Sequence, residues 1–271
     1  MIRLNENWNK INQIVHKNIE DLKDRYSVNY KMGLVALQKD YSVSLPMFMH
    51  YLQESALLHT FSVHNPKSFY NKDSLAWVLT HWQVKILRYP KFEEEIEVFT
   101  WPSAFKLYFG ERGFLVKNKK GEDLAFANSS WILLNRPSLK PERVSDDMKV
   151  KFGKAYPFLL DKDFKLPKIK DPKLIYNGNY SVTRRDIDTN YHVNNTKYIE
   201  WIYDYLPNDI YNNFRAETLK VVYKKEVLKE DIVTIDIYEK RDDGYIQIVA
   251  TISKNNTIAT EIYCNFKPLA L

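Results

Sequence analysis

The residues best suited to chemistry lie in one stretch, R-R-D-I-D-T-N-Y-H-V-N-N-T-K-Y, at residues 184–198. Asp188, Asn190 and His192 alternate there, and an extended segment would project them, together with Asp186, from one side. A carboxylate and a histidine can orient and deprotonate a water molecule. An amide side chain can stabilise the oxyanion that forms when a carbonyl is attacked. The stretch therefore predicts a site of hydrolysis.

Two neighbouring features belong to the same predicted site. Asn194 and Asn195 stand where a helix is expected to begin, and either can cap its free N–H groups and partial positive charge. Glu226 lies in a later strand, V-V-Y-K-K-E-V, and could position water or act as the base. The residues alone leave a second interpretation open, because Asx-rich loops before helices commonly serve as caps and turns.

Other classes of site find no support in the sequence. Only 7 glycines occur, and no GxGxxG or GxxxxGK[ST] pattern is present, which argues against a nucleotide cofactor. The acidic stretch lacks the Gly and the spaced Glu of a calcium loop. The histidines lie apart, and Cys264 is the single cysteine, so no paired-cysteine zinc site or intrachain disulfide can form. We expect neither a cofactor nor a metal, and we expect Cys264 to be buried.

Composition and charge limit where the protein is expected to be located and which partners it is expected to bind. Hydrophobic residues make up 45% and charged residues 27% of the 271 residues, as in globular proteins. No apolar run is long enough to span a membrane, and the first residues lack a secretory signal, so a cytoplasmic location is expected. The net charge of +6 suits an acidic partner. No basic run is interleaved with aromatic residues, so nucleic acid is not an expected partner.

The elements that must position the site form a pattern that occurs twice. A helix is predicted over residues 7–24, and a second over 45–63, with Ser44 as its cap and Pro46 in its first turn. Strands follow at 78–86, 95–101, 105–117 and 123–135, where Pro102 separates two of them. The second half repeats the order, with a short strand around 179–184, a helix at 195–206, and strands at 217–227, 231–239, 245–253 and 257–266.

A long helix wrapped by an antiparallel sheet, used twice in one chain, predicts an α+β protein with a double hotdog fold. A-L-Q-K-D-Y-S, before the first long helix, parallels V-T-R-R-D-I-D, before the second. An unrelated α+β protein with coincidental repetition is the alternative. The predicted division is an N-terminal helical extension (1–26), an N-terminal hotdog (27–136), a Pro- and Lys-rich linker (137–175) and a C-terminal hotdog (176–271).

Several motifs resemble one known family. D-I-D-T-N-Y-H-V-N-N-T-K-Y-I-E-W-I resembles the signature D-x-D-x-N-x-H-V-N-N-x-x-Y-I-x-W of the acyl-acyl carrier protein (acyl-ACP) thioesterases, and the chain looks like a bacterial relative of the plant plastid enzymes. V-Y-K-K-E-V-L-K-E-D-I-V resembles the family's Y-R-R-E-C-x-x-D-x-V segment. In the first half, residues 76–90, 100–102 and 127–135 resemble further family blocks. The similarity extends from about residue 27 to the C-terminus.

The resemblance implies a specific function and site. Fatty acyl-ACP thioesters would be hydrolysed to free fatty acid and acyl carrier protein, the acidic partner, without a cofactor. The catalytic positions of the family match Asp188, Asn190, His192 and Glu226, and the N-terminal half would line the acyl pocket. The plant pattern has Cys where this chain has Val227, so attack by water is expected rather than a Cys acyl-enzyme.

The first repeat is expected to have lost its chemistry. Ser42, Ser44 and Pro46 stand in the region where that repeat would need its own acidic and histidine residues.

Two other functions remain open, namely hydrolysis of acyl-coenzyme A by the same fold and acyl binding by a regulator without turnover. The sequence is also compatible with a homodimer. Basic residues expected near the entrance for steering a carrier are Arg184, Arg185, Lys197, Lys224 and Lys225.

Overall fold

The computed structural model describes residues 22, 24–63 and 75–269. The helix predicted over 7–24 therefore lies almost entirely outside the described residues. The first half contains β1 (Tyr26–Lys31), the 3-10 helix η1 (Leu34–Ala36), α2 (Leu45–Val63), β2 (Leu75–Ile86), β3 (Glu95–Lys106), β4 (Phe109–Asn118) and β5 (Asp123–Asn135). The connection contains β6 (Lys140–Pro141) and α4 (Asp146–Lys151). The second half contains β7 (Lys173–Ser181), η2 (Arg184–Asp186), α5 (Asn195–Asp204), α6 (Asn208–Asn213), β8 (Phe214–Tyr223), β9 (Ile232–Asp242), β10 (Tyr245–Lys254) and β11 (Thr257–Pro268).

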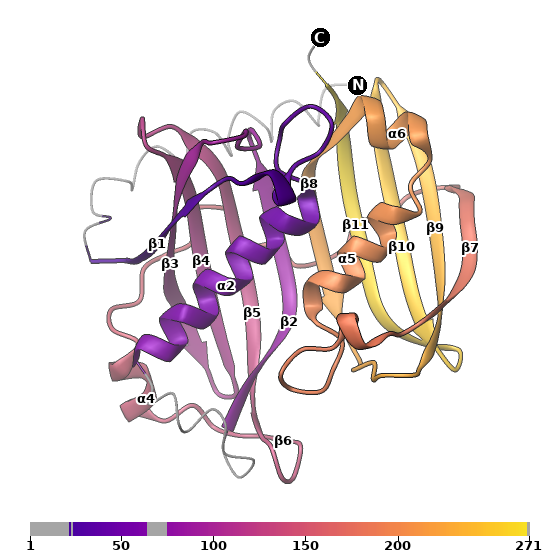
Figure 1. Ribbon diagram of the computed structural model, residues 1–271. Coiled ribbons are helices and arrows are strands. Elements are labelled where there is room, and N and C mark those ends of the chain that lie inside the picture. Colours follow the sequence, from indigo (N-terminus) through magenta and orange to yellow (C-terminus); the bar gives the residue numbers. More distant parts are fainter. Residues whose placement is uncertain (1–21, 23, 64–74, 270–271) are drawn as a thin grey trace.

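The strands form one antiparallel sheet in which the two halves mirror each other. Its order is β1-β3-β4-β5-β2-β8-β11-β10-β9-β7, with β6 paired to β5. Each half therefore has the same internal order when read outward from the centre, and the halves join where β2 pairs with β8. Figure 1 shows α2 across one face of the first half and α5 across the same face of the second.

Both long helices form because one side of each carries large apolar residues. Leu45, Phe48, Met49 and Leu52 of α2 are buried, as are Ile199 and Trp201 of α5. The Oγ of Ser44 accepts a hydrogen bond from the N–H of Met47 (3.4 Å) at the start of α2, as predicted. The bounds predicted for α2 are confirmed, and α5 ends at Asp204, two residues before the predicted end at 206. No helix in the described part of the chain is long and apolar enough to cross a bilayer.

The strand break predicted at Pro102 is wrong. β3 continues through Pro102, where a register shift against β4 lies between Pro102 and Ala104. Such an irregularity accommodates proline because the missing N–H falls where the ladder is already interrupted. Pro102 therefore bends a strand instead of ending it.

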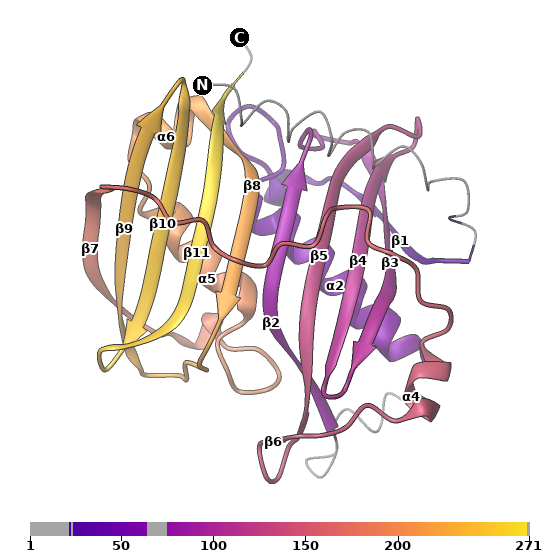
Figure 2. The same ribbon diagram turned by 180° about the vertical axis from the view of Figure 1, so that it is seen from behind.

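The connection between the halves covers the back of the sheet, as Figure 2 shows. It buries Tyr156, Leu159 and Leu160 against Trp101 and Phe126, which form a second hydrophobic cluster. Polar contacts follow its course. The Nε2 of Gln83 donates to the carbonyl of Asp161 (2.8 Å), and the Nδ2 of Asn128 donates to the carbonyl of Leu160 (2.8 Å). The segment therefore stabilises the sheet as well as linking its halves.

Candidate active site

The loop before α5 is a tight turn. The N–H of Asp188 donates to the carbonyl of His192 (2.9 Å), and the N–H of Tyr191 donates to the carbonyl of Asp188 (3.1 Å). Tyr191 has a positive φ of 66°. The prediction of an extended segment is wrong, because η2 and this turn fold the chain back on itself.

Asp186 points away from the other polar residues. Its Oδ2 accepts from the N–H (2.7 Å) and the Oγ1 (2.7 Å) of Thr183, and its Oδ1 accepts from the Nε1 of Trp201 (3.3 Å). Burial raises the pKa of its carboxyl, but these donors outweigh that effect and hold the pKa below its ordinary value. Asp186 is therefore a structural cap rather than part of the site.

Asp188, Asn190 and His192 share the turn and meet Glu226 from the loop between β8 and β9. The Nε2 of His192 lies 3.1 Å from the Oε2 of Glu226. The N–H of Asn190 donates to the Oδ1 of Asp188 (2.7 Å), and its Nδ2 lies 3.4 Å from the Oδ2. The structure thus brings together Asp188, Asn190, His192 and Glu226, with Glu226 in a loop and not in the predicted strand.

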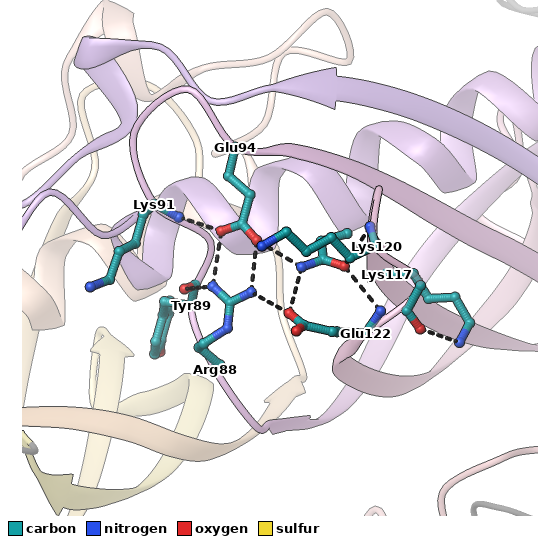
Figure 3. Close-up of polar contacts among 9 residues, drawn as sticks. Arg88, Tyr89, Lys91, Glu94, Lys117, Lys120 and Glu122 are labelled. Carbon is teal, nitrogen blue, oxygen red and sulfur yellow. Dashed lines mark hydrogen bonds and ion pairs between the residues drawn. The ribbon is translucent and has the colours of Figure 1, made fainter.

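The loop that carries Glu226 has a counterpart in the first half. The N–H of Leu228 donates to the Oδ2 of Asp231 (2.7 Å), just as the N–H of Lys91 donates to the Oε2 of Glu94 (2.9 Å). The guanidinium of Arg88 donates two hydrogen bonds to the carboxylate of Glu94 (2.9 and 2.7 Å) and one to the Oε2 of Glu122 (3.3 Å). Figure 3 shows these contacts. The same loop shape is therefore fixed in each half by a carboxylate at its end.

The turn before α5 also has a counterpart before α2. Leu37 pairs with Val43 as Ile187 pairs with Val193, and Ser42 pairs with Lys91 as His192 pairs with Leu228. Tyr41, with a φ of 57°, stands where Tyr191 stands in the second half. A-L-Q-K-D-Y-S therefore corresponds to D-I-D-T-N-Y-H, and the predicted match to V-T-R-R-D-I-D is wrong.

The counterpart turn lacks the histidine and the glutamate of the turn before α5. Gln38, Asp40, Ser42 and Tyr89 occupy the positions of Asp188, Asn190, His192 and Glu226. Ser42 replaces the histidine as predicted, but the prediction for Ser44 and Pro46 is wrong, because they correspond to Asn194 and Thr196. Asp40 accepts from the Oγ of Ser42 (2.7 Å) and pairs with the Nη2 of Arg215 (3.1 Å). These contacts are structural and leave no base.

The histidine and the glutamate of the site perturb each other. The hydrogen bond to Glu226 raises the pKa of His192 in spite of its partial burial, and the charge of Asp188 adds to this. The same hydrogen bond lowers the pKa of Glu226. If Nε2–H is donated to the carboxylate, the Nδ1 of the neutral ring carries the free lone pair. No hydrogen bond to this Nδ1 occurs within the described ranges.

Arg136 is a further member of the site that the sequence did not indicate. It follows β5, in the first half, and its Nη2 donates to the Oδ1 of Asn190 (3.0 Å). Its charge opposes the rise in the pKa of His192. No motif contains Arg136, and only the pairing of the two halves brings it to the turn.

An apolar cavity of about 50 Å³ lies between α2 and the sheet of the first half. Its lining includes Ala56, Thr60, Trp77, Phe105, Trp131 and Phe152. Arg112 also lines it and bonds to the Nδ1 of His59 (2.8 Å) and the Oγ1 of Thr100 (3.1 Å). Burial lowers the pKa of Arg112 to about 9 and that of His59 to about 3. The cavity is therefore apolar with a polar edge.

Cys264 has no place in the chemistry. It is buried in β11, and burial raises the pKa of its thiol to about 12, so the prediction that it is a core residue is confirmed. Val227, beside Glu226, is fully buried. Among the described residues, no group of three or more His, Cys, Asp or Glu side chains could hold a metal ion.

Comparison with known proteins identifies the family. The models for the N-terminal and C-terminal domains of acyl-ACP thioesterases match residues 23–152 and 170–268. The chain belongs to the acyl-ACP thioesterase family. Among its curated relatives, the chloroplastic palmitoyl-acyl carrier protein thioesterase of Arabidopsis thaliana is 31% identical over 219 residues, covering 76% of this chain and 53% of that protein. The enzyme of the same name from Gossypium hirsutum is 30% identical over 244 residues, covering 86% and 56%.

This member of the acyl-ACP thioesterase family spans about half the length of the curated relatives it matches. Solved structures share its fold. The 12:0-ACP thioesterase from Umbellularia californica is similar with a TM-score of 0.80 at 22% identity, over 90% of this chain and 94% of that one. An acyl-ACP thioesterase from Bacteroides thetaiotaomicron gives 0.75 at 20% identity, over 89% and 97%. The predicted α+β double hotdog fold is confirmed.

Proposed function

We propose that this chain hydrolyses fatty acyl-ACP thioesters to free fatty acid and acyl carrier protein, with Asp188, Asn190, His192 and Glu226 as its catalytic residues. The observation that carries the proposal is the 3.1 Å contact between His192 and Glu226, beside Asp188 and Asn190, in a member of the acyl-ACP thioesterase family. No cofactor is needed, because these groups can activate water and stabilise an oxyanion.

In the proposed mechanism, Glu226 holds the Nε2–H of His192 and leaves Nδ1 to accept a proton. A water oxygen attacks the thioester carbon while its proton passes to Nδ1. The Nδ2 of Asn190 and the partial positive charge at the start of α5 stabilise the oxyanion. The C–S bond then breaks, and the imidazolium returns its proton to the carrier thiolate. Asp188 orients Asn190 by accepting its N–H.

In this proposal the two halves have different functions. We assign catalysis to the C-terminal hotdog (176–271) and the acyl pocket to the N-terminal hotdog (27–136), with 137–175 as the linker. The cavity beneath α2 supports this assignment by its tryptophan and phenylalanine lining. Its volume of about 50 Å³ is smaller than that of a typical ligand pocket, roughly 300–1,000 Å³, so the support comes from the lining and not from the size.

Basic residues near the site would steer an acidic carrier. Lys197 and Lys224 pair with Glu200 (2.6 Å) and Glu261 (2.5 Å), which partly neutralises them. Arg184, Arg185 and Lys225 are exposed and are the stronger candidates. We therefore expect kcat/KM to fall steeply with added salt, because steering acts through screened charges. A rate constant at low substrate concentration that does not change with salt would contradict steering.

The deciding experiment measures free-thiol release from lauroyl-, palmitoyl- and oleoyl-ACP, and from the matching acyl-coenzyme A substrates, by the wild-type protein and His192→Ala. The proposal expects release from the ACP forms by the wild type and loss of release in the variant. Faster release from coenzyme A would reject the carrier as substrate. Tight acyl binding without release of any thiol would show a regulator in place of an enzyme.

A further inference from the structure

Arg136 occupies a rigid turn that reaches from the first half to the second. The Oδ1 of Asn135 accepts from the N–H (3.1 Å) and the Oγ (2.9 Å) of Ser138, and the N–H of Leu139 donates to the carbonyl of Asn135 (2.8 Å). The short β5–β6 pairing closes the hairpin. Figures 1 and 2 both show this hairpin at the end of the sheet where the loop before α5 lies. The guanidinium therefore extends from a fixed base.

The contacts of Arg136 are unlike those of a structural arginine. Within the part of the chain that the structure describes, it pairs with no carboxylate, and its buried Nε has no hydrogen-bond partner. The hydrogen bond from Nη2 to the Oδ1 of Asn190 is the polar contact that its side chain makes there. A side chain that stabilised only its own hairpin would have no need to reach a residue of the other half.

The chemistry of guanidinium determines which way the amide of Asn190 faces. Arginine has donors and no acceptor, so the atom of Asn190 that faces it must be the carbonyl oxygen. The amide NH₂ group then points to the opposite side, where the Oδ2 of Asp188 lies 3.4 Å away. An amide without such a partner could turn over, which would present an acceptor where the reaction needs a donor.

We propose that Arg136 is a positioning residue for the thioesterase reaction, supplied by the half that lacks catalytic groups, and that it holds the Asn190 amide with its NH₂ group available to the thioester oxygen. This inference rests on the proposed function. It also makes the catalytic turn dependent on the N-terminal half, beyond that half's role in lining the acyl pocket.

The charge of Arg136 gives the inference a second, independent consequence. Glu226, Asp188 and Arg136 are the charged groups that act on His192, the first two raising its pKa and Arg136 lowering it. Loss of the guanidinium should therefore raise the pKa of His192. A base with a higher pKa becomes neutral only at higher pH, so the acid limb of the rate profile should move upward.

The test compares Arg136→Ala and Arg136→Lys with Arg143→Ala, an exposed arginine beyond the same hairpin. We expect Arg136→Ala to lower kcat about 10- to 100-fold with little change in KM, as small misplacements of a reacting group do. Arg136→Lys should recover part of kcat, because lysine keeps the charge and a donor but loses the planar fork. Arg143→Ala should behave as wild type. A raised KM with unchanged kcat would instead assign Arg136 to carrier binding and overturn the proposal.

An NMR measurement separates this inference from the proposed function. The His192 ring is titrated in the wild type and in Arg136→Ala, and the side-chain amide signals of Asn190 are followed in both. An upward shift of the His192 midpoint with altered amide signals is expected. If neither changes, the proposal fails whatever the activity. If both change and the wild-type protein releases no thiol, the hydrolysis is rejected and the coupling of Arg136 to the turn stands.

Discussion

At the residue scale, four side chains distinguish the turn before α5, where we propose catalysis, from the turn before α2. The turns before α2 and α5 share their backbone pairing and a tyrosine with positive φ. One presents Asp188, Asn190 and His192 toward Glu226, and the other presents Asp40 to Arg215. The backbone shape of the turn is therefore common to both halves, and the two turns differ in the side chains that they carry.

Glu226→Gln should change both the rate and its pH dependence. The hydrogen bond to Glu226 is the main cause of the raised pKa of His192, so its replacement by an amide should lower that pKa. His192 must be neutral to accept a proton, so the acid limb of kcat/KM should move to lower pH, while the plateau falls about 10²- to 10⁴-fold. A pH–rate profile checks this, with the exposed Glu230→Gln as the control. An acid limb at the same pH as in the wild type would show that Glu226 does not raise the pKa of His192, and would contradict the proposed pair.

At the scale of elements, close strand packing behind the sheet restricts residue size. Gly113 of β4 lies opposite Trp101 of β3, and a Cβ placed on Gly113 would lie 2.6 Å from the Cε2 of Trp101. Trp101 is buried, and its Nε1 donates to the carbonyl of Pro157 (3.2 Å) in the connection. The tryptophan therefore has little room to move away.

Gly113→Ala should lower the free energy of unfolding by about 1–3 kcal/mol, the usual cost of overpacking a filled core. Gly33→Ala is the matched control, since nothing lies within 4 Å of a Cβ there, and it should change stability by less than about 0.5 kcal/mol. Urea unfolding measures both. Equal stability of the two variants would show that the ring of Trp101 can shift freely.

At the scale of the whole molecule, the β2–β8 pairing makes one sheet from two hotdogs. Val84 lies opposite Leu219, and both are fully buried. Beside them the Nζ of Lys85 pairs with the Oε1 of Glu217 at 3.1 Å, with about a tenth of each side chain exposed. Burial lowers the pKa of Lys85 to about 8, against the opposing effect of Glu217. The junction therefore contains a charge that depends on its partner.

Glu217→Gln should destabilise the protein by about 1–3 kcal/mol near pH 7, because a buried ammonium loses its carboxylate. The variant should lower the pKa of Lys85 further. Once the pH exceeds about 8, Lys85 is neutral in both folded proteins, so the deficit should shrink. Urea unfolding of both proteins at about pH 6 and about pH 9 tests whether the loss of stability becomes smaller as the pH rises. A deficit that grew with pH would contradict the assignment.

The sequence by itself determined what depends on local pattern. Helical spacing specified α2, and repetition together with alternation specified the double hotdog. The residue types of one short stretch indicated Asp188, Asn190 and His192, and the position of Glu226 in a predicted strand, together with a family motif, indicated Glu226. Each of these patterns is contained in a short stretch of sequence or recurs at a fixed period. Each can therefore be recognised without knowledge of the tertiary structure.

Only the tertiary structure decided what depends on distant contacts. Asp186 points inward there, because Thr183 and the buried Trp201 donate hydrogen bonds to its carboxylate. The tertiary structure carried β3 through Pro102, because the neighbouring strand tolerates a shift in register there. It brought Arg136 to Asn190, across a separation of 54 residues. Such pairings have no period and no local composition, since they arise only when the two halves close against each other.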